Sequence, residues 1–218
     1  MEFRYYLEIR ISNLGFVFMI IIVDYGMGNL RSVSKAFEEV GAKVKVSDDP
    51  KAVSGADKLV VPGVGAFKDA MRELRARRLI EPIKKFVKSG KPFLGLCLGL
   101  QLLFSESEEG GRSKGLDIIK GRVLRFPRGA LKIPHMGWNR LRSDGKCPLL
   151  KGIPDGSYMY FVHSYYADPD DDGCVAAWTD YGIEFPSVVC SKNIYATQFH
   201  PEKSQKLGLK ILRNYAKL

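Results

Sequence analysis

The fold is decided by the stretch Lys91-Pro92-Phe93-Leu94-Gly95-Leu96-Cys97-Leu98-Gly99-Leu100-Gln101. It predicts a short apolar strand, a tight turn that carries one cysteine, and a helix from about Leu98 to Ser105. A side chain at such a turn stands clear of the backbone at the end of the strand. Gly95 and Gly99 flank Cys97 where neighbouring backbone passes closely, since a Cβ there would collide. The amides that open the helix favour a thiolate, so we predict that Cys97 is a nucleophile and not merely a small buried residue.

The flanking sequence predicts an α/β fold with a central, mostly parallel sheet. Met19–Val23 is continuously apolar, as expected of a strand covered on both faces, and a helix is expected from Leu30 to Gly41. Strand, helix, strand in this order is typical of a parallel sheet flanked by helices. Further strands are expected at 44–46, 59–61, 123–126, 158–165, 175–178, 187–191 and 194–199, a loop at 168–172, and helices at 68–78, 80–89 and 205–216. The second half of the chain should extend the sheet and add an antiparallel β layer.

The bulk composition indicates a single soluble domain. The chain has 218 residues, and 34 Lys and Arg against 24 Asp and Glu give a net charge of +10. The basic residues are scattered, and their densest clusters lie on predicted helices, where such runs are usually solvated faces. We therefore expect no nucleic-acid partner; a surface for an acidic protein or a phosphorylated substrate is favoured. The four cysteines form no C-x-x-C pair, so neither a zinc site nor a disulfide framework is expected, and a reducing cytoplasm fits best: Cys97, Cys147, Cys174 and Cys190.

The N-terminus is read as an extension over residues 1–18, followed by one domain over residues 19–218. The apolar run Leu14–Val23 follows Arg4 and Arg10, like a signal peptide, but no small-residue cleavage site follows it. It is also too short to span a bilayer. No membrane association is expected.

His200 is the best candidate for the base that a cysteine nucleophile needs. It ends an apolar strand, and Glu202 lies two residues further on. Residues two apart in extended chain project to the same side, so the carboxylate can orient the imidazole. His135 and His163 have no acid at that offset and are expected to be structural. The predicted chemistry is attack of the Cys97 thiolate on a carboxamide, with His200 protonating the leaving nitrogen and then activating water.

Two glycine-rich turns invite a ligand. Pro62-Gly63-Val64-Gly65 follows a predicted strand, and its amides could form an oxyanion hole beside Cys97. Gln101 lies one helical turn past Cys97, within reach of its substrate. Gly26-Met27-Gly28 suggests dinucleotide binding, but Arg31 occupies the place of the third glycine. No cofactor is expected.

Several motifs resemble those of a known family. Gly95–Gln101 and His200-Pro201-Glu202 look like the triad motifs of class I glutamine amidotransferases. Within that family, the chain from Met19 onward resembles the glutaminase subunits of imidazole glycerol phosphate synthases. The resemblance rests on five motifs in the right order: Asp24–Leu30, Pro62–Gly65, Pro134–Asn139, Phe161–Tyr165 and His200–Ser204.

The resemblance implies a fold, a reaction and a partner. The chain would be a class I amidotransferase that hydrolyses glutamine to glutamate and ammonia without a cofactor or metal. Ammonia would pass, within a heterodimer, to a (β/α)8-barrel cyclase subunit of histidine biosynthesis, without which family members are nearly inactive. The implied residues are the triad Cys97, His200 and Glu202; for the oxyanion and substrate Gly63, Val64, Gly65, Leu98, Gln101, His163, Ser164 and Tyr165; and for the partner Trp138, Asn139, Tyr160 and Lys203.

Two alternatives stay open on the sequence. The chain could be a glutaminase that serves another synthase, of the aminodeoxychorismate or guanylate type, although Asp24–Leu30 and Pro134–Asn139 speak against it. It could also be a non-catalytic module that keeps the fold, which the intact triad disfavours.

Overall fold

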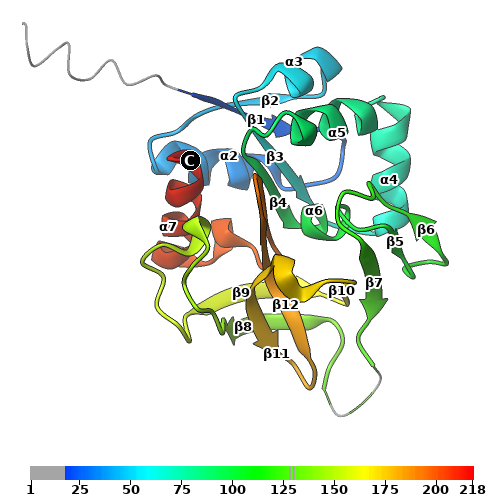
Figure 1. Ribbon diagram of the computed structural model, residues 1–218, viewed down its shortest axis with the longest axis vertical. Coiled ribbons are helices and arrows are strands. Elements are labelled where there is room, and N and C mark those ends of the chain that lie inside the picture. Colours follow the sequence, from blue (N-terminus) through cyan, green and yellow to red (C-terminus); the bar gives the residue numbers. More distant parts are fainter. Residues whose placement is uncertain (1–17, 128, 130) are drawn as a thin grey trace, which may run out of the picture.

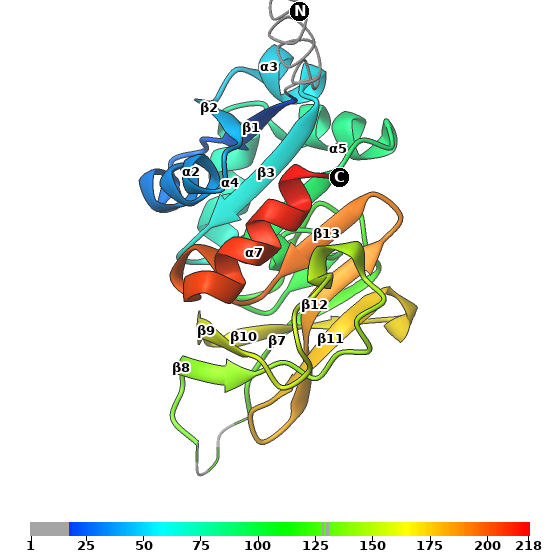
Figure 2. The ribbon, with the colours of Figure 1, turned by 90° about the vertical axis from the view of Figure 1, so that its left-hand side faces the viewer.

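A seven-stranded sheet forms the centre of the computed structural model, which describes residues 18–127, 129 and 131–218 (Figures 1 and 2). Its strand order is β11-β12-β13-β4-β3-β1-β2. The five neighbouring strands from β13 to β2 are parallel, whereas β12 is antiparallel to β13 and β11 is antiparallel to β12. The expected extension at 1–18 lies, apart from Phe18, outside the described residues. The strands are β1 (Met19–Val23), β2 (Lys43–Ser47), β3 (Lys58–Gly63), β4 (Phe93–Cys97), β11 (Val175–Asp180), β12 (Glu184–Ser191) and β13 (Ile194–Thr197).

Helices cover both faces of the parallel part of the sheet (Figure 1). Ile20 and Ile22 of β1 belong to the core that includes the buried residues of two helices, whereas Ile21 and Val23 belong to the core on the other face. Successive strand residues point to opposite faces, so burial on both sides explains the continuous apolar run. None of the helices in the described part of the chain is long and apolar enough to cross a membrane. One face carries α2 (Leu30–Glu39) and α7 (Gln205–Ala216), and the other α3 (Pro50–Gly55), α4 (Phe67–Ala76) and α5 (Ile80–Lys88).

The second half extends the sheet and adds smaller β layers, as predicted. A four-stranded sheet has the order β10-β7-β5-β6, and β8 and β9 form a separate hairpin. The predicted strand 158–165 is broken at Ser164, because the chain leaves the hairpin there and enters the other sheet. The predicted loop at 168–172 was wrong in part, because 168–169 ends β10, and β8 forms where no strand was predicted. The strands are β5 (Glu106–Ser107), β6 (Ser113–Lys114), β7 (Gly121–Arg125), β8 (His135–Arg140), β9 (Tyr158–His163) and β10 (Tyr165–Pro169).

The helix after Cys97 is much shorter than predicted. The α6 helix (Leu98–Gln101) makes a single turn and does not reach Ser105. The helical bonds are not continued: the backbone N–H of Ser105 donates to the carbonyl oxygen of Gly121, and the carbonyls of Leu102 and Phe104 accept hydrogen bonds from residues 116 and 117. These long-range bonds replace the helical ones, so the helix dipole behind the cysteine is weaker than the sequence suggested.

The sheet brings three chain segments to one edge. Strand β4 lies between β3 and β13, and all three run parallel. In register, Gly63 pairs with Cys97, and Thr197 pairs with Leu96. The carboxyl ends of parallel strands meet at the same edge, which is where α/β sheets commonly bind ligands. The chain that follows Thr197 therefore begins next to Cys97.

Candidate active site

Cys97 occupies a strained turn at the end of β4. Its φ of 53° and ψ of −106° place a non-glycine residue in sparsely populated backbone space. The predicted close approach is confirmed at both glycines. A Cβ on Gly99 would overlap the carbonyl oxygen of Val61, and one on Gly95 would lie 2.6 Å from the carbonyl oxygen of Gly99. The two glycines thus allow the elbow to pack against β3.

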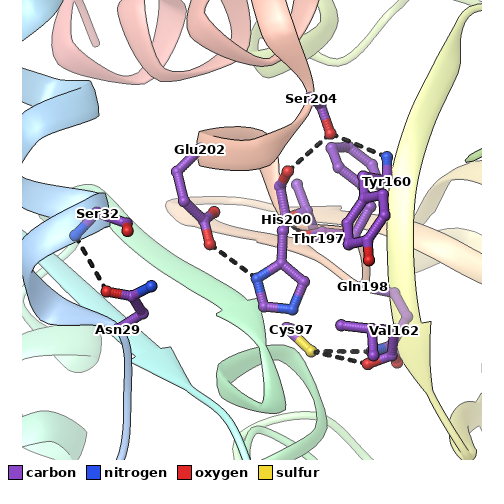
Figure 3. A network of polar contacts seen from close by, with 11 residues as sticks. Asn29, Ser32, Cys97, Tyr160, Val162, Thr197, Gln198, His200, Glu202 and Ser204 are labelled. Atoms are coloured by element: carbon purple, nitrogen blue, oxygen red, sulfur yellow. Dashed lines mark hydrogen bonds and ion pairs between the residues drawn. The ribbon is translucent and has the colours of Figure 1, made fainter. Parts of the chain in front are cut away.

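His200 and Glu202 form a buried pair above the cysteine (Figure 3). The Nδ1 atom of His200 lies 2.8 Å from Oε1 of Glu202, and the two side chains are 4% and 2% exposed. Glu202 is the predicted partner of His200, but the predicted extended geometry was wrong. Pro201–Lys203 forms the 3-10 helix η3, so this segment is not extended. The turn of η3 brings Glu202 back toward the imidazole.

The other ring nitrogen of His200 faces the cysteine. Nε2 is buried and makes no hydrogen bond of standard geometry within the described residues, and Figure 3 shows the ring between Glu202 and Cys97. Burial alone would lower the pKa of His200, but the negative charge of Cys97, followed by the contact with Glu202, raises it to about 10. An imidazole held between a carboxylate and a sulfur is the arrangement that can activate a cysteine nucleophile.

The two remaining histidines bond to each other and stay neutral. Nδ1 of His135 lies 2.9 Å from Nε2 of His163, whose Nδ1 lies 2.8 Å from the carbonyl oxygen of Tyr165. A carbonyl can only accept, so Nδ1 of His163 carries the proton and its Nε2 accepts from His135. Burial lowers the pKa of His135 to about 4 and that of His163 to about 3. Neither is therefore protonated near neutral pH.

A cavity of about 330 Å³ opens over the cysteine. Cys97 and His200 line it, and so do seven of the eight residues expected to bind the oxyanion or substrate; Gly63 lies beside Cys97 in register without lining it. Within residues 18–127, 129 and 131–218, no three His, Cys, Asp or Glu side chains are grouped so that they could hold a metal ion. The seven lining residues are Val64, Gly65, Leu98, Gln101, His163, Ser164 and Tyr165.

Two further residues at the site were not predicted from the sequence. Glu109 lines the cavity, and its Oε2 accepts a 2.7 Å hydrogen bond from the backbone N–H of Phe67 at the start of α4. Burial raises the pKa of Glu109, although that bond opposes the shift. Gln198 lies behind the cysteine, with Nε2 3.8 Å from the sulfur. Glu109 sits in an irregular segment without a motif, whereas Gln198 was visible only as a neighbour of His200.

The four residues expected at a partner interface divide between two environments. Trp138 and Tyr160 lie edge to face with ring centroids 5.9 Å apart, and Nζ of Lys203 lies 5.9 Å from the Tyr160 ring centroid. Asn139 is instead engaged internally. Its Nδ2 atom donates to the carbonyl oxygen of Asp180 at 2.7 Å and lies 3.3 Å from His135 Nε2. Successive β8 residues alternate faces, which explains this division.

The fold and the site together match the class of hydrolases in which a cysteine at a strand–helix elbow lies beside a histidine and a glutamate from the chain after a neighbouring parallel strand. The family model described as "Glutamine amidotransferase class-I" matches residues 21–217, and the chain belongs to this family.

Relatives and solved structures agree with this assignment. Imidazole glycerol phosphate synthase subunit HisH of Syntrophotalea carbinolica is 57% identical over 203 residues, covering 90% of this chain and 98% of its own length. The protein of that name from Methanosarcina mazei is 54% identical over 201 residues, covering 91% of this chain and 98% of its own length. A crystal structure titled glutamine amidotransferase has a TM-score of 0.71 at 20% identity, covering 91% and 99%. The structure of PurLQS from Thermotoga maritima has a TM-score of 0.70 at 18% identity, and the match covers 91% of this chain and 97% of that one. The two structures share the fold.

Proposed function

We propose that this chain is the glutaminase subunit of an imidazole glycerol phosphate synthase, and that residues 19–218 form its amidotransferase domain. The observation that carries the proposal is the array of Cys97, His200 and Glu202 at the edge of a cavity sized for a small substrate. The family match over residues 21–217 and the names of the curated relatives support it. Those names favour this synthase over the aminodeoxychorismate and guanylate alternatives.

The first half of the reaction forms an acyl-enzyme. The Cys97 thiolate attacks the carboxamide carbon of glutamine, and the carbonyl oxygen gains negative charge. Val64, Gly65 and Leu98 line the cavity beside the sulfur, and their backbone amides are the candidates to receive that charge. His200 gives its proton to the nitrogen as the C–N bond breaks, so ammonia leaves and a thioester remains.

The second half depends on a change in the charge around His200. The negative charge of Cys97 holds the proton on His200 in the free enzyme and raises its pKa to about 10. That charge disappears when the sulfur becomes a thioester, so the pKa of His200 falls and the ring becomes a base. It then takes a proton from water, which attacks the thioester and releases glutamate. Glu202 holds the ring in the Nδ1–H tautomer throughout.

Glu109 supplies the charge that would recognise the amino-acid end of glutamine. Its carboxylate lies in the cavity with Cys97 and Gln101, and its backbone bond to Phe67 fixes its position. The α-ammonium group of glutamine is a matching partner for a partly buried carboxylate. Binding both ends of the substrate would place its carboxamide at the sulfur.

We further propose that the large exposed apolar and aromatic residues of the β8–β9 hairpin dock a (β/α)8-barrel cyclase in a heterodimer. Met136 is 62% exposed, Trp138 46% and Tyr158 48%, and large exposed apolar side chains of this kind are typical interface anchors. This face adjoins the nucleophile. The N–H of His200 donates to the carbonyl oxygen of Tyr160 at 3.0 Å. Ammonia released at Cys97 would thus form next to the partner, which protects it from protonation in water.

The partner would hold the phosphorylated substrate, so the net charge of +10 need not serve nucleotide binding by this chain. A cytoplasmic location fits such a biosynthetic pair. The competent form of the oxyanion segment would be favoured when the partner binds, as a shift between two populations.

The test is glutamine hydrolysis by the purified chain, alone and with a cyclase barrel and its nucleotide ligand. We expect weak turnover alone and strong stimulation in the complex. Equal turnover in both would overturn the regulatory part, and no turnover in either would overturn the glutaminase itself. Trp138→Ala should weaken the complex. Val46→Ala is the matched control. Val46 is 39% exposed, but it lies on β2, the edge strand of the seven-stranded sheet, far from the β8–β9 hairpin (Figure 1).

A further inference from the structure

A fully buried amide lies against the reacting sulfur. Gln198 is 0% exposed and sits between the end of β13 and His200. Its Nε2 atom is 3.8 Å from Sγ of Cys97, and its Oε1 atom is 3.1 Å from Nε2 of Gln101. Figure 3 shows Gln198 reaching the sulfur on the side of β9, whereas His200 approaches from the side of Glu202.

The direction of this amide is set by a backbone carbonyl. Nε2 of Gln101 lies 3.0 Å from the carbonyl oxygen of Tyr165, which can only accept a hydrogen bond. Gln101 must therefore present its NH₂ group to that oxygen. The same NH₂ group donates to Oε1 of Gln198, so the NH₂ group of Gln198 is the end that faces the sulfur. The orientation of the Gln198 amide therefore follows from which groups of this network can donate a hydrogen bond and which can only accept one.

We infer that Gln198 is a further catalytic residue, a second hydrogen-bond donor that holds the Cys97 sulfur as a thiolate and aims it into the cavity. The inference rests on the proposed glutaminase function. A thiolate accepts a hydrogen bond better than a thiol or a thioester does, because the charge strengthens the bond. Gln198 thus stabilises the sulfur before it attacks and again when it leaves as glutamate is released.

A packing role alone does not account for this residue. A buried amide is costly unless its polar ends are bonded, and an apolar side chain of similar volume would fill the same space. Here one end is bonded to Gln101, and the sulfur is the group that the other end meets. The carbonyl oxygen of Val162, 4.0 Å from Sγ, is an acceptor and cannot hold a thiolate.

The test is the pH dependence of Cys97 alkylation by iodoacetamide in the full chain, followed on the Cys97 peptide by mass spectrometry. Gln198→Met keeps the volume and removes the donor. We expect the pH of half-maximal rate to rise by about one unit, which is the shift that loss of one hydrogen bond to a charged group produces. Gln198→Glu keeps the acceptor for Gln101 but sets a carboxylate beside the sulfur, so its shift should be larger.

The Gln198→Met profile decides the matter. A packing role predicts that Gln198→Met leaves the profile of the folded protein unchanged, and that result would overturn the inference. A smaller shift for Gln198→Glu than for Gln198→Met would overturn it too. If both variants fail to fold, the side-chain amide resonances of Gln198 in the unmutated chain provide the readout. They should move with the ionisation of the sulfur, and invariance would reject the donor role.

Alkylation requires neither glutamine nor a partner. A chain that hydrolyses glutamine but shows no shift in the variants would refute the role of Gln198 and leave the glutaminase standing. A chain that shows the shift but never hydrolyses glutamine would refute the glutaminase function and leave the donor role of Gln198 standing.

Discussion

Gly99→Ala tests whether the elbow must pack directly on its neighbouring strand. A Cβ at Gly99 would fall on the carbonyl oxygen of Val61, which is backbone and cannot rotate away. Ordinary carbon contacts begin near 3.5 Å, so α6 and β3 would have to part by about 1.5 Å. Overpacking of this kind typically costs up to about 3 kcal/mol in the free energy of unfolding. We expect a folded but less stable protein.

The same displacement should also impair catalysis. Gly63 follows Val61 by two residues on β3 and pairs in register with Cys97, so moving β3 moves the oxyanion segment away from the sulfur. A misplacement of about 1 Å in a catalytic array can cost roughly 100-fold in rate. The assays are urea unfolding and glutamine hydrolysis in the complex with the cyclase.

Gly55→Ala provides the matched control for this variant. A Cβ at Gly55, in α3, would meet no atom within 4 Å. That variant should be neutral or gain up to about 1 kcal/mol, because alanine is the better helix former. Wild-type stability and rate in Gly99→Ala would refute the close packing on which the elbow depends.

Three further predictions concern charge. Glu202→Gln removes the carboxylate that helps hold the proton on His200. Because the pKa of His200 is about 10, kcat/KM of the unmutated enzyme should fall near that pH, whereas the variant should be slower and lose activity at lower pH. An alkaline limb of the pH profile that does not move would contradict this. Glu109→Gln should raise KM for glutamine about tenfold while it changes kcat less, as a lost charge-assisted contact to bound substrate would; an unchanged KM would refute the assignment. His135 and His163 have folded pKa values of about 4 and about 3, below the usual 6.5, so unfolding takes up protons, and the free energy of unfolding should fall as pH drops from 6.5 toward 4. His135→Gln should flatten that slope, as measured by urea unfolding at each pH, and an equally steep slope would contradict the assignment.

The sequence predicted the parts of the fold that local pattern controls. The apolar run of β1 and the helical spacing of apolar residues in α2 gave the correct elements, because burial on two faces or on one stripe leaves a direct trace in the residues. The α6 helix was predicted too long, since the backbone that follows it bonds to residues 115–118 and 121, which no local pattern reveals. Strand β8 was missed for a similar reason, because its partner β9 lies some twenty residues further on.

The site divides in the same way. Cys97 and His200 follow strands whose ends carry recognisable turns, so their meeting could be inferred from parallel topology. Glu109 could not, because it reaches the cavity from an irregular segment and is fixed by a bond to Phe67 in α4. Gln198 lies two residues before His200 in the sequence, but its role became visible only through its distance to the sulfur.

Mass spectrometry of the chain after treatment with a glutamine-shaped electrophile tests the central claim most directly. The account predicts one adduct, on Cys97, formed much faster than on Cys147, Cys174 or Cys190. It also predicts that His200→Ala slows that adduct sharply while the other thiols react as before. Equal labelling of all four cysteines, or a Cys97 rate indifferent to His200, would contradict the activated nucleophile at the centre of this structure.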